Sequence, residues 1–171
     1  MNQSVSCGNR VQEKKESPMF QADNSEAASR TERLLRVGPR QVFAAFERPD
    51  LLARWWGPSG FTNTFEQFAF KPGGRWVFVM HGPNGASYPN ECVFREILPD
   101  ARIVIDHVVA PLFTLTVNLT PEYGATRISW VQEFESPEVA ARLRPIVDPA
   151  NEQNLDRLQA LLAEDVRPAA Q

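Results

Sequence analysis

The sequence predicts an α+β fold in which a curled antiparallel sheet of about seven strands holds one long C-terminal helix across its concave face. Three observations lead to this prediction. Six strand-like runs follow one another between short turns with no helical segment between them, which is typical of antiparallel pairing. Two short helical segments follow an initial strand, and a leucine-rich amphipathic segment closes the chain. A sheet this long twists and curls, so its concave face needs that apolar segment as a partner.

The first elements are indicated by apolar spacing and by breaker residues. The run TERLLRV (31–37) is expected to be a strand, and RQVFAAFE (40–47) a short helix with its aromatic residues on one face. A second short helix is expected to begin at Pro49 and to end at Gly57-Pro58. Turn residues bound the expected strands, which are 61–70, 75–81, 88–98, 102–109, 112–120 and 125–134.

The last helix is predicted from its capping residues. Asp148 is expected to be its N-cap with Pro149 in the first turn, and Leu155, Leu158 and Leu161 follow at helical spacing. A shorter helical piece over 137–145 is expected to lead into it.

Composition divides the chain into one domain and two tails. Residues 1–28 are polar and lack apolar periodicity, so we expect a disordered N-terminal tail, a folded domain over 29–165 and a short C-terminal tail over 166–171. Met19 offers an alternative start of translation, which an intact mass of the natively expressed protein would decide.

Charge and motif content exclude several classes of function. A net charge of −3 in 171 residues lacks the basic face that nucleic-acid binding needs, and no segment approaches the length of a membrane span. Two cysteines without an apolar leader fit a reducing cytoplasm. His81 and His107, the two histidines, lack the spacing of a metal site, and Gly73-Gly74 has no following helix to bind a phosphate. We therefore expect a cytoplasmic protein without metal or cofactor.

Four stretches resemble a known family. They are VFAAFERPDLLARWWGPSGF, FKPGGRWVFVMHGPNG, FREILPDARIVIDH and GATRISWVQEF, and together they span about residues 30–164. They resemble the activator of heat-shock-protein-90 ATPase homologue-like family of the SRPBCC or START-like superfamily, which implies the helix-grip fold. Many members carry a Gly-Trp pair at the start of the last helix. The corresponding ANEQNLDRL (150–158), together with YPNE (88–91) and IDH (105–107), indicates a distinct branch.

Tryptophans are the first candidates for a ligand pocket between sheet and helix. The side chains of consecutive helix residues point about 100° apart around the helix axis, so Trp55 and Trp56 cannot both face the same part of the core. One is expected to pack against the sheet and the other to lie along the rim, where it could wall a cavity. Trp76 and Trp130 face the same choice between core and cavity wall.

Strand alternation selects further cavity residues. Phe113, Leu115 and Val117 alternate with polar residues and are expected on the concave face, as is Trp130 with Gln132. His107 shares the inward parity of Ile103 and Ile105, which makes it the best candidate for an inward titratable group.

The strand 88–98 is ambiguous. Either Cys92, Phe94 and Glu96 face inward, or Glu91, Val93, Arg95 and Ile97 do. The second choice would place Glu91 beside His107 as a usable acid–base pair.

On the last helix, Asn151 and Asn154 continue the stripe that contains Leu158. They fit a polar patch inside a cavity, or a first turn that is merely solvated.

Three functions fit these residues. The favoured one is a binding protein that holds a small hydrophobic or aromatic molecule in the cavity. The second is a metal-free enzyme of the polyketide cyclase, hydratase or lyase type, with His107 and Glu91 as acid and base and Asn151 or Asn154 orienting a substrate carbonyl. The third, implied by the family resemblance, is a chaperone ATPase regulator, which needs an exposed partner surface. Edge strands of such sheets often pair across a homodimer.

Overall fold

The computed structural model describes residues 24–165. The predicted tail 166–171 and residues 1–23 of the predicted N-terminal tail lie outside the described residues. A 3-10 helix, η1 (Asn24–Ala27), precedes the first strand and lies within the range 1–28 that the sequence analysis expects to be the tail. Ala27 and Ala28 are buried, and the Arg144 guanidinium donates hydrogen bonds to the main-chain carbonyls of Glu26 and Ala28. These contacts hold the start of the domain against its last helix.

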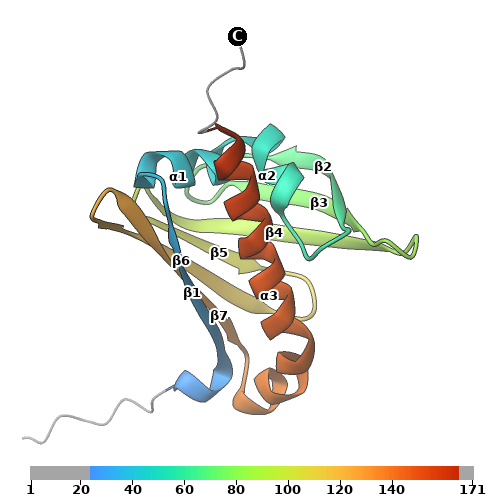
Figure 1. The fold of residues 1–171 in the computed structure, drawn as a ribbon. Helices are drawn as coiled ribbons and strands as arrows, with labels where there is room; N and C mark the ends of the chain where they lie inside the picture. Colours follow the sequence, from blue (N-terminus) through green and yellow to red (C-terminus); the bar gives the residue numbers. More distant parts are fainter. Residues whose placement is uncertain (1–23, 166–171) are drawn as a thin grey trace, which may run out of the picture.

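Seven antiparallel strands form one curled sheet, as the sequence predicts (Figure 1). Their order across the sheet is β1-β7-β6-β5-β4-β3-β2, so every neighbour except β1–β7 is joined by a short turn. The strands are β1 (Ala28–Leu35), β2 (Thr62–Phe68), β3 (Arg75–His81), β4 (Ser87–Leu98), β5 (Arg102–His107), β6 (Phe113–Glu122) and β7 (Ala125–Phe134).

Three α-helices complete the fold of residues 24–165. The two short ones, α1 (Pro39–Glu47) and α2 (Pro49–Trp55), each begin with proline, whose missing N–H is not needed in a first turn. The long helix α3 (Pro137–Asp165) crosses the concave side of the sheet (Figure 1). Within residues 24–165, no helix combines the length and apolar character that crossing a bilayer requires.

The predicted helix start at Asp148 is wrong, because α3 is continuous from Pro137 and contains Pro145 and Pro149. Proline in a helix interior removes a hydrogen bond and favours a bend. In Figure 1 the orange first turns of α3 run at an angle to its red main body. Asp148 does not cap the helix; its carboxylate accepts a hydrogen bond from the Ser29 hydroxyl at 2.6 Å.

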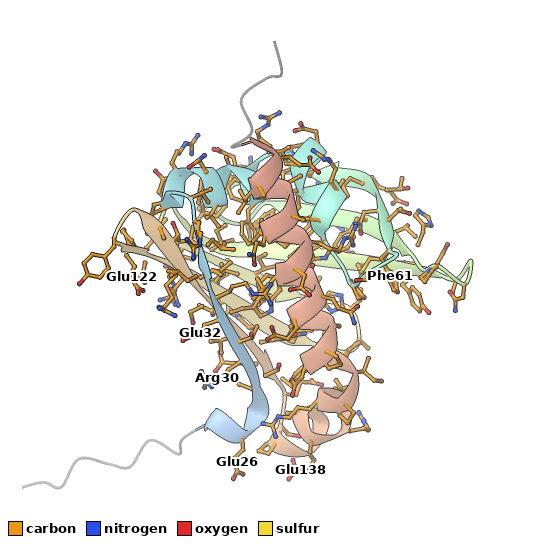
Figure 2. All side chains as sticks on the ribbon, in the orientation of Figure 1. Glu26, Arg30, Glu32, Phe61, Glu122 and Glu138 are labelled. Atoms are coloured by element: carbon orange, nitrogen blue, oxygen red, sulfur yellow. The ribbon has the colours of Figure 1, made fainter. Side chains whose placement is uncertain are left out.

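A polar seam joins β1 to α3. Ser29, Thr31 and Arg33 alternate along β1, and they bind Asp148, Glu152 and Asp156, which follow at intervals of four along α3. Two strand residues span about 6.8 Å and four helix residues about 6.0 Å, so the two periods match over three rungs. The seam therefore fixes both the direction and the register of α3 on the sheet. Figure 2 shows Arg30 and Glu32, the alternate residues of β1, pointing away from the sheet.

The core lies between the sheet, α3 and the two short helices. Its largest fully buried side chains include Trp55, Trp76 and Trp130. Leu158 lies in the centre of the buried face of α3 and is fully buried, whereas Ile146 of the same helix is 70% exposed.

We predict that Leu158→Ala lowers the free energy of unfolding by about 2–5 kcal/mol, because the surrounding core cannot fill the cavity left behind. Ile146→Ala on the same helix is the matched control, expected within about 0.5 kcal/mol of wild type. Urea unfolding followed by tryptophan fluorescence measures both. Equal losses for the two variants would contradict this placement of α3.

Candidate functional site

A cavity of about 230 Å³ lies between the sheet and α3. Its apolar lining comes from five strands, from the segment after α2 and from the turn between β5 and β6, and consists of Trp56, Pro58, Phe78, Met80, Cys92, Ile105, Pro111, Phe113, Leu115 and Trp130. Its polar lining consists of Asn90, His107, Gln132, Asn151 and Asn154. None of the lining residues is Asp, Glu, Lys or Arg, so the site is apolar with a few amides and one imidazole.

Seven of the predicted site residues line this cavity: Trp56, His107, Phe113, Leu115, Trp130, Asn151 and Asn154. Four others, Trp55, Trp76, Val117 and Leu158, are fully buried in the hydrophobic core and do not line it. They face the right side of their elements, but other side chains cover them.

The two adjacent tryptophans have different roles. Trp55 is fully buried, and its indole N–H donates to the Ala45 carbonyl at 3.0 Å. Trp56 is the C-cap residue of α2, with extended backbone, and its ring packs 4.9 Å from the Trp76 ring and 5.6 Å from the Trp130 ring. Trp55 therefore anchors α2 in the core, and Trp56 forms part of the cavity wall.

Side chains of α3 hold the segment that carries Trp56. The Arg157 guanidinium donates five hydrogen bonds of 2.8–3.2 Å to main-chain carbonyls, those of Arg54, Trp56, Gly57, Pro58 and Phe61. The Asn154 carbonyl oxygen accepts the Gly57 N–H at 2.7 Å. Gly57 has a φ of 97°, a backbone conformation that residues with a Cβ rarely adopt, so the turn favours glycine.

His107 has both ring nitrogens engaged. Nδ1 lies 2.8 Å from the Pro111 carbonyl oxygen, which can only accept, and Nε2 lies 2.8 Å from Asn90 Oδ1. The Asn90 amino group donates to the Tyr88 carbonyl at 2.8 Å, so Asn90 presents its oxygen to Nε2. The two oxygens that face the ring favour its protonated form, and burial opposes that charge. Burial lowers the pKa of His107, and the hydrogen bond to Pro111 opposes that shift. The ring also stacks on Phe113, 4.5 Å between centroids.

The alternative of Glu91 as a partner of His107 is wrong. Cys92 and Phe94 are buried on the concave face, and Glu91 lies on the opposite face, where Arg75 Nε donates to its carboxylate at 3.0 Å. The ambiguity of this strand has a physical origin, because the register with β5 shifts between Phe94 and Glu96. After that irregularity Ile97 packs against the core, so each of the two predicted alternations holds for one part of the strand.

Burial also changes the chemistry of the Cys92 thiol. It raises the pKa of Cys92 to about 12, so the thiol stays protonated and acts as a small apolar wall residue. Among residues 24–165, no group of three His, Cys, Asp or Glu side chains is arranged to hold a metal ion.

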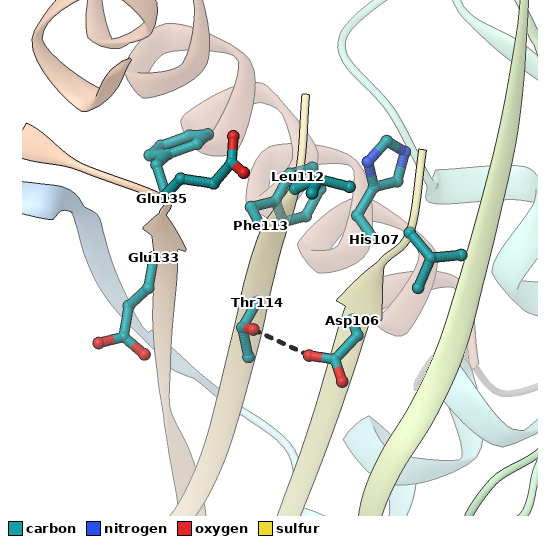
Figure 3. A pocket seen from close by; sticks show the side chains of 9 residues that line it. Asp106, His107, Leu112, Phe113, Thr114, Glu133 and Glu135 are labelled. Carbon is teal, nitrogen blue, oxygen red and sulfur yellow. Dashed lines mark hydrogen bonds between the residues drawn. The ribbon is translucent and has the colours of Figure 1, made fainter. Parts of the chain in front are cut away.

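A second hollow, a groove of about 530 Å³, lies on the other side of His107 and Phe113, which line both. Figure 3 shows Asp106, Thr114 and Glu133 of this groove, with the Thr114 hydroxyl bonded to Asp106 at 2.8 Å. The stacked His107 and Phe113 rings thus belong to the wall between groove and cavity.

Two polar residues of the cavity were not assigned to the site from the sequence. Gln132 had the correct inward parity, but nothing local distinguished it from a structural glutamine. Asn90 shares the face of Cys92, and the YPNE stretch that contains it contacts the IDH stretch through His107. Only the pairing of β4 with β5 brings these two stretches together.

The curled sheet, the long helix across it and the cavity between them define a helix-grip domain. A model of the family described as "Activator of Hsp90 ATPase homolog 1-like protein" matches residues 36–163, and the chain belongs to this family. A comparison with curated protein sequences found no significant match.

Solved structures with the same fold come from several bacteria. A protein from Nitrosomonas europaea is 21% identical with a TM-score of 0.75, over 82% of this chain and 97% of that one. One from Arthrobacter aurescens is 25% identical with a TM-score of 0.77, over 86% and 90%. The AHSA1 protein of Silicibacter pomeroyi is 23% identical with a TM-score of 0.66, over 81% and 99%. At these identities the likeness concerns the fold.

We predict that Arg157→Met destabilises the protein by about 2–4 kcal/mol, because five main-chain carbonyls lose a charged donor. Near-ultraviolet circular dichroism should also weaken, since Trp56 loses its fixed position. Arg54→Met, which removes an exposed ion pair with Glu164, is the control and should cost less than about 1 kcal/mol. If Arg157→Met loses no more stability than Arg54→Met, the position of the segment after α2 does not depend on Arg157.

The lowered pKa of His107 predicts a pH dependence of stability. The unfolded chain binds a proton at a higher pH than the folded one, so stability is complete above the ordinary histidine pKa and falls as pH drops below it. Between pH 7 and pH 5, wild type should lose stability relative to His107→Phe with a slope of up to about 1.4 kcal/mol per pH unit. Urea unfolding at each pH measures this, with His81→Gln as control. If the free energy of unfolding changes equally with pH in wild type and in His107→Phe, the prediction is contradicted.

Proposed function

We propose that the protein binds a small hydrophobic or aromatic molecule in the cavity between the sheet and α3. The observation that carries this proposal is an interior space of about 230 Å³ walled by the rings of Trp56, Phe78, Phe113 and Trp130. Apolar walls with a few fixed polar groups are the usual composition of small-molecule sites. We also propose a cytoplasmic location, which the lack of a disulfide pattern in the sequence supports.

The contacts of His107 and Glu91 argue against the cyclase or hydratase alternative. A general base needs a free lone pair directed at its substrate, and both nitrogens of His107 are engaged by Pro111 and Asn90. Glu91, the other expected catalytic group, lies on the opposite face of the sheet with Arg75. For a chaperone regulator, the family description is the supporting observation.

Native mass spectrometry of protein purified gently from its own host tests the proposal, with denatured extraction in parallel. We expect an added mass that disappears on denaturation. In Cys92→Phe, the larger side chain projects into the cavity and should abolish the added mass. The neighbouring Val93→Phe points to the other face of the sheet and should retain it. A clean apo mass for wild type, or an added mass unaffected by Cys92→Phe, would contradict binding in this cavity.

A further inference from the structure

We propose that the cavity selects an uncharged aromatic molecule by its carbonyl oxygen, which the side-chain amino groups of Gln132 and Asn154 bind together. This inference rests on the proposed function, since it concerns what the cavity binds. It follows from the direction of the hydrogen bonds around these two buried amides.

The orientation of Asn154 is fixed by a main-chain group. The Gly57 N–H is only a donor, so the oxygen of the Asn154 amide must face it, at 2.7 Å. The amino group, Nδ2, is then the free end of the side chain. It has no hydrogen-bond partner within the part of the chain that the structure describes.

The orientation of Gln132 is fixed by a relay of three hydrogen bonds from β1 and α3. The Asp148 carboxylate only accepts, so the Ser29 hydroxyl donates to it at 2.6 Å and uses its own lone pair for Asn151 Nδ2 at 3.3 Å. The same Asn151 amino group donates to Gln132 Oε1 at 3.0 Å. The free end of Gln132 is therefore Nε2, again a donor without a partner among residues 24–165.

Because both amides are buried, their unpaired N–H groups favour a ligand that offers an oxygen acceptor. Gln132 and Asn154 are each 7% exposed and both line the cavity. Unpaired N–H groups at such a site lower the free energy of the complex when a ligand oxygen accepts from them. Asn151 lines the same cavity, and its oxygen accepts no hydrogen bond from the rest of residues 24–165, so it is an available acceptor for an N–H beside the ligand carbonyl, as in a lactam.

The charge of the lining and the volume of the cavity restrict the class of ligand further. The cavity lining contains no carboxylate, lysine or arginine, and burial lowers the pKa of its one imidazole, His107, so a buried carboxylate or ammonium on the ligand would have no counterion there at neutral pH. A cavity of about 150 Å³ holds benzene, and ordinary ligand pockets start at about 300 Å³. The space of about 230 Å³ between these limits fits one or two fused rings.

Four probes with one ring skeleton test the proposal by isothermal titration calorimetry on the full chain. They are indane, 1-indanone, isoindolin-1-one and indane-1-carboxylate. We expect 1-indanone and isoindolin-1-one to bind at least about tenfold more tightly than indane, because two hydrogen bonds are added, and the carboxylate to bind more weakly than indane. Equal affinities for indane and 1-indanone, or tightest binding of the carboxylate, would overturn carbonyl recognition and leave the proposed function standing. Failure of all four to bind would overturn both.

Variants separate the donors from general effects on the fold. Gln132→Met keeps the length of the side chain and removes its donor, so 1-indanone should bind about three- to tenfold more weakly while indane is unaffected. Ser29→Ala breaks the relay that orients Gln132 and should reduce the preference for 1-indanone over indane. Thr31→Ala removes the next rung of the same seam and should leave that preference unchanged. A preference unchanged in Gln132→Met, with the variant folded by circular dichroism, would overturn the assignment.

Discussion

The arrangement of the site depends on one guanidinium. Arg157 reaches from α3 to five main-chain carbonyls, one in the last turn of α2 and four in the segment that follows it, and no other side chain in the described residues makes so many bonds to this region. Carbonyls at a helix end and in a tight turn need donors, and one planar group with several N–H bonds can serve them together. Because the segment is fixed from α3, the Trp56 ring has a defined place over the sheet. The cavity is the space that remains below it.

The position of α3 depends in turn on its seam with β1. The match between the strand and helix periods keeps Asp148, Glu152 and Asp156 opposite Ser29, Thr31 and Arg33. The outer two pairs are exposed and contribute little individually, but they define a register. The innermost pair continues through Asn151 to Gln132, so the same seam that places the helix also orients an amide in the cavity.

Local pattern predicted most of the fold and about half of the cavity lining. Leu115, Trp130 and His107 were assigned to the concave face because alternation along a strand is a local property. The sequence could not separate Trp56 from Trp76, since both face inward and only tertiary packing decides which one borders empty space. It also did not reveal the irregularity after Phe94, which reverses the alternation, or the contact of Asn90 with His107 across two strands. The continuity of α3 through two prolines was missed because helix contacts with β1 outweigh a local breaking signal.

Methyl-resolved NMR with indane as an uncharged probe tests the central claim most directly. A cavity between sheet and helix predicts chemical-shift changes at the methyl groups of Met80, Ile105 and Leu115, which line it on three different strands. Val108 and Leu112, which line only the outer groove, should not shift. Shifts confined to Val108 and Leu112, or shifts at none of these five residues, would contradict the account.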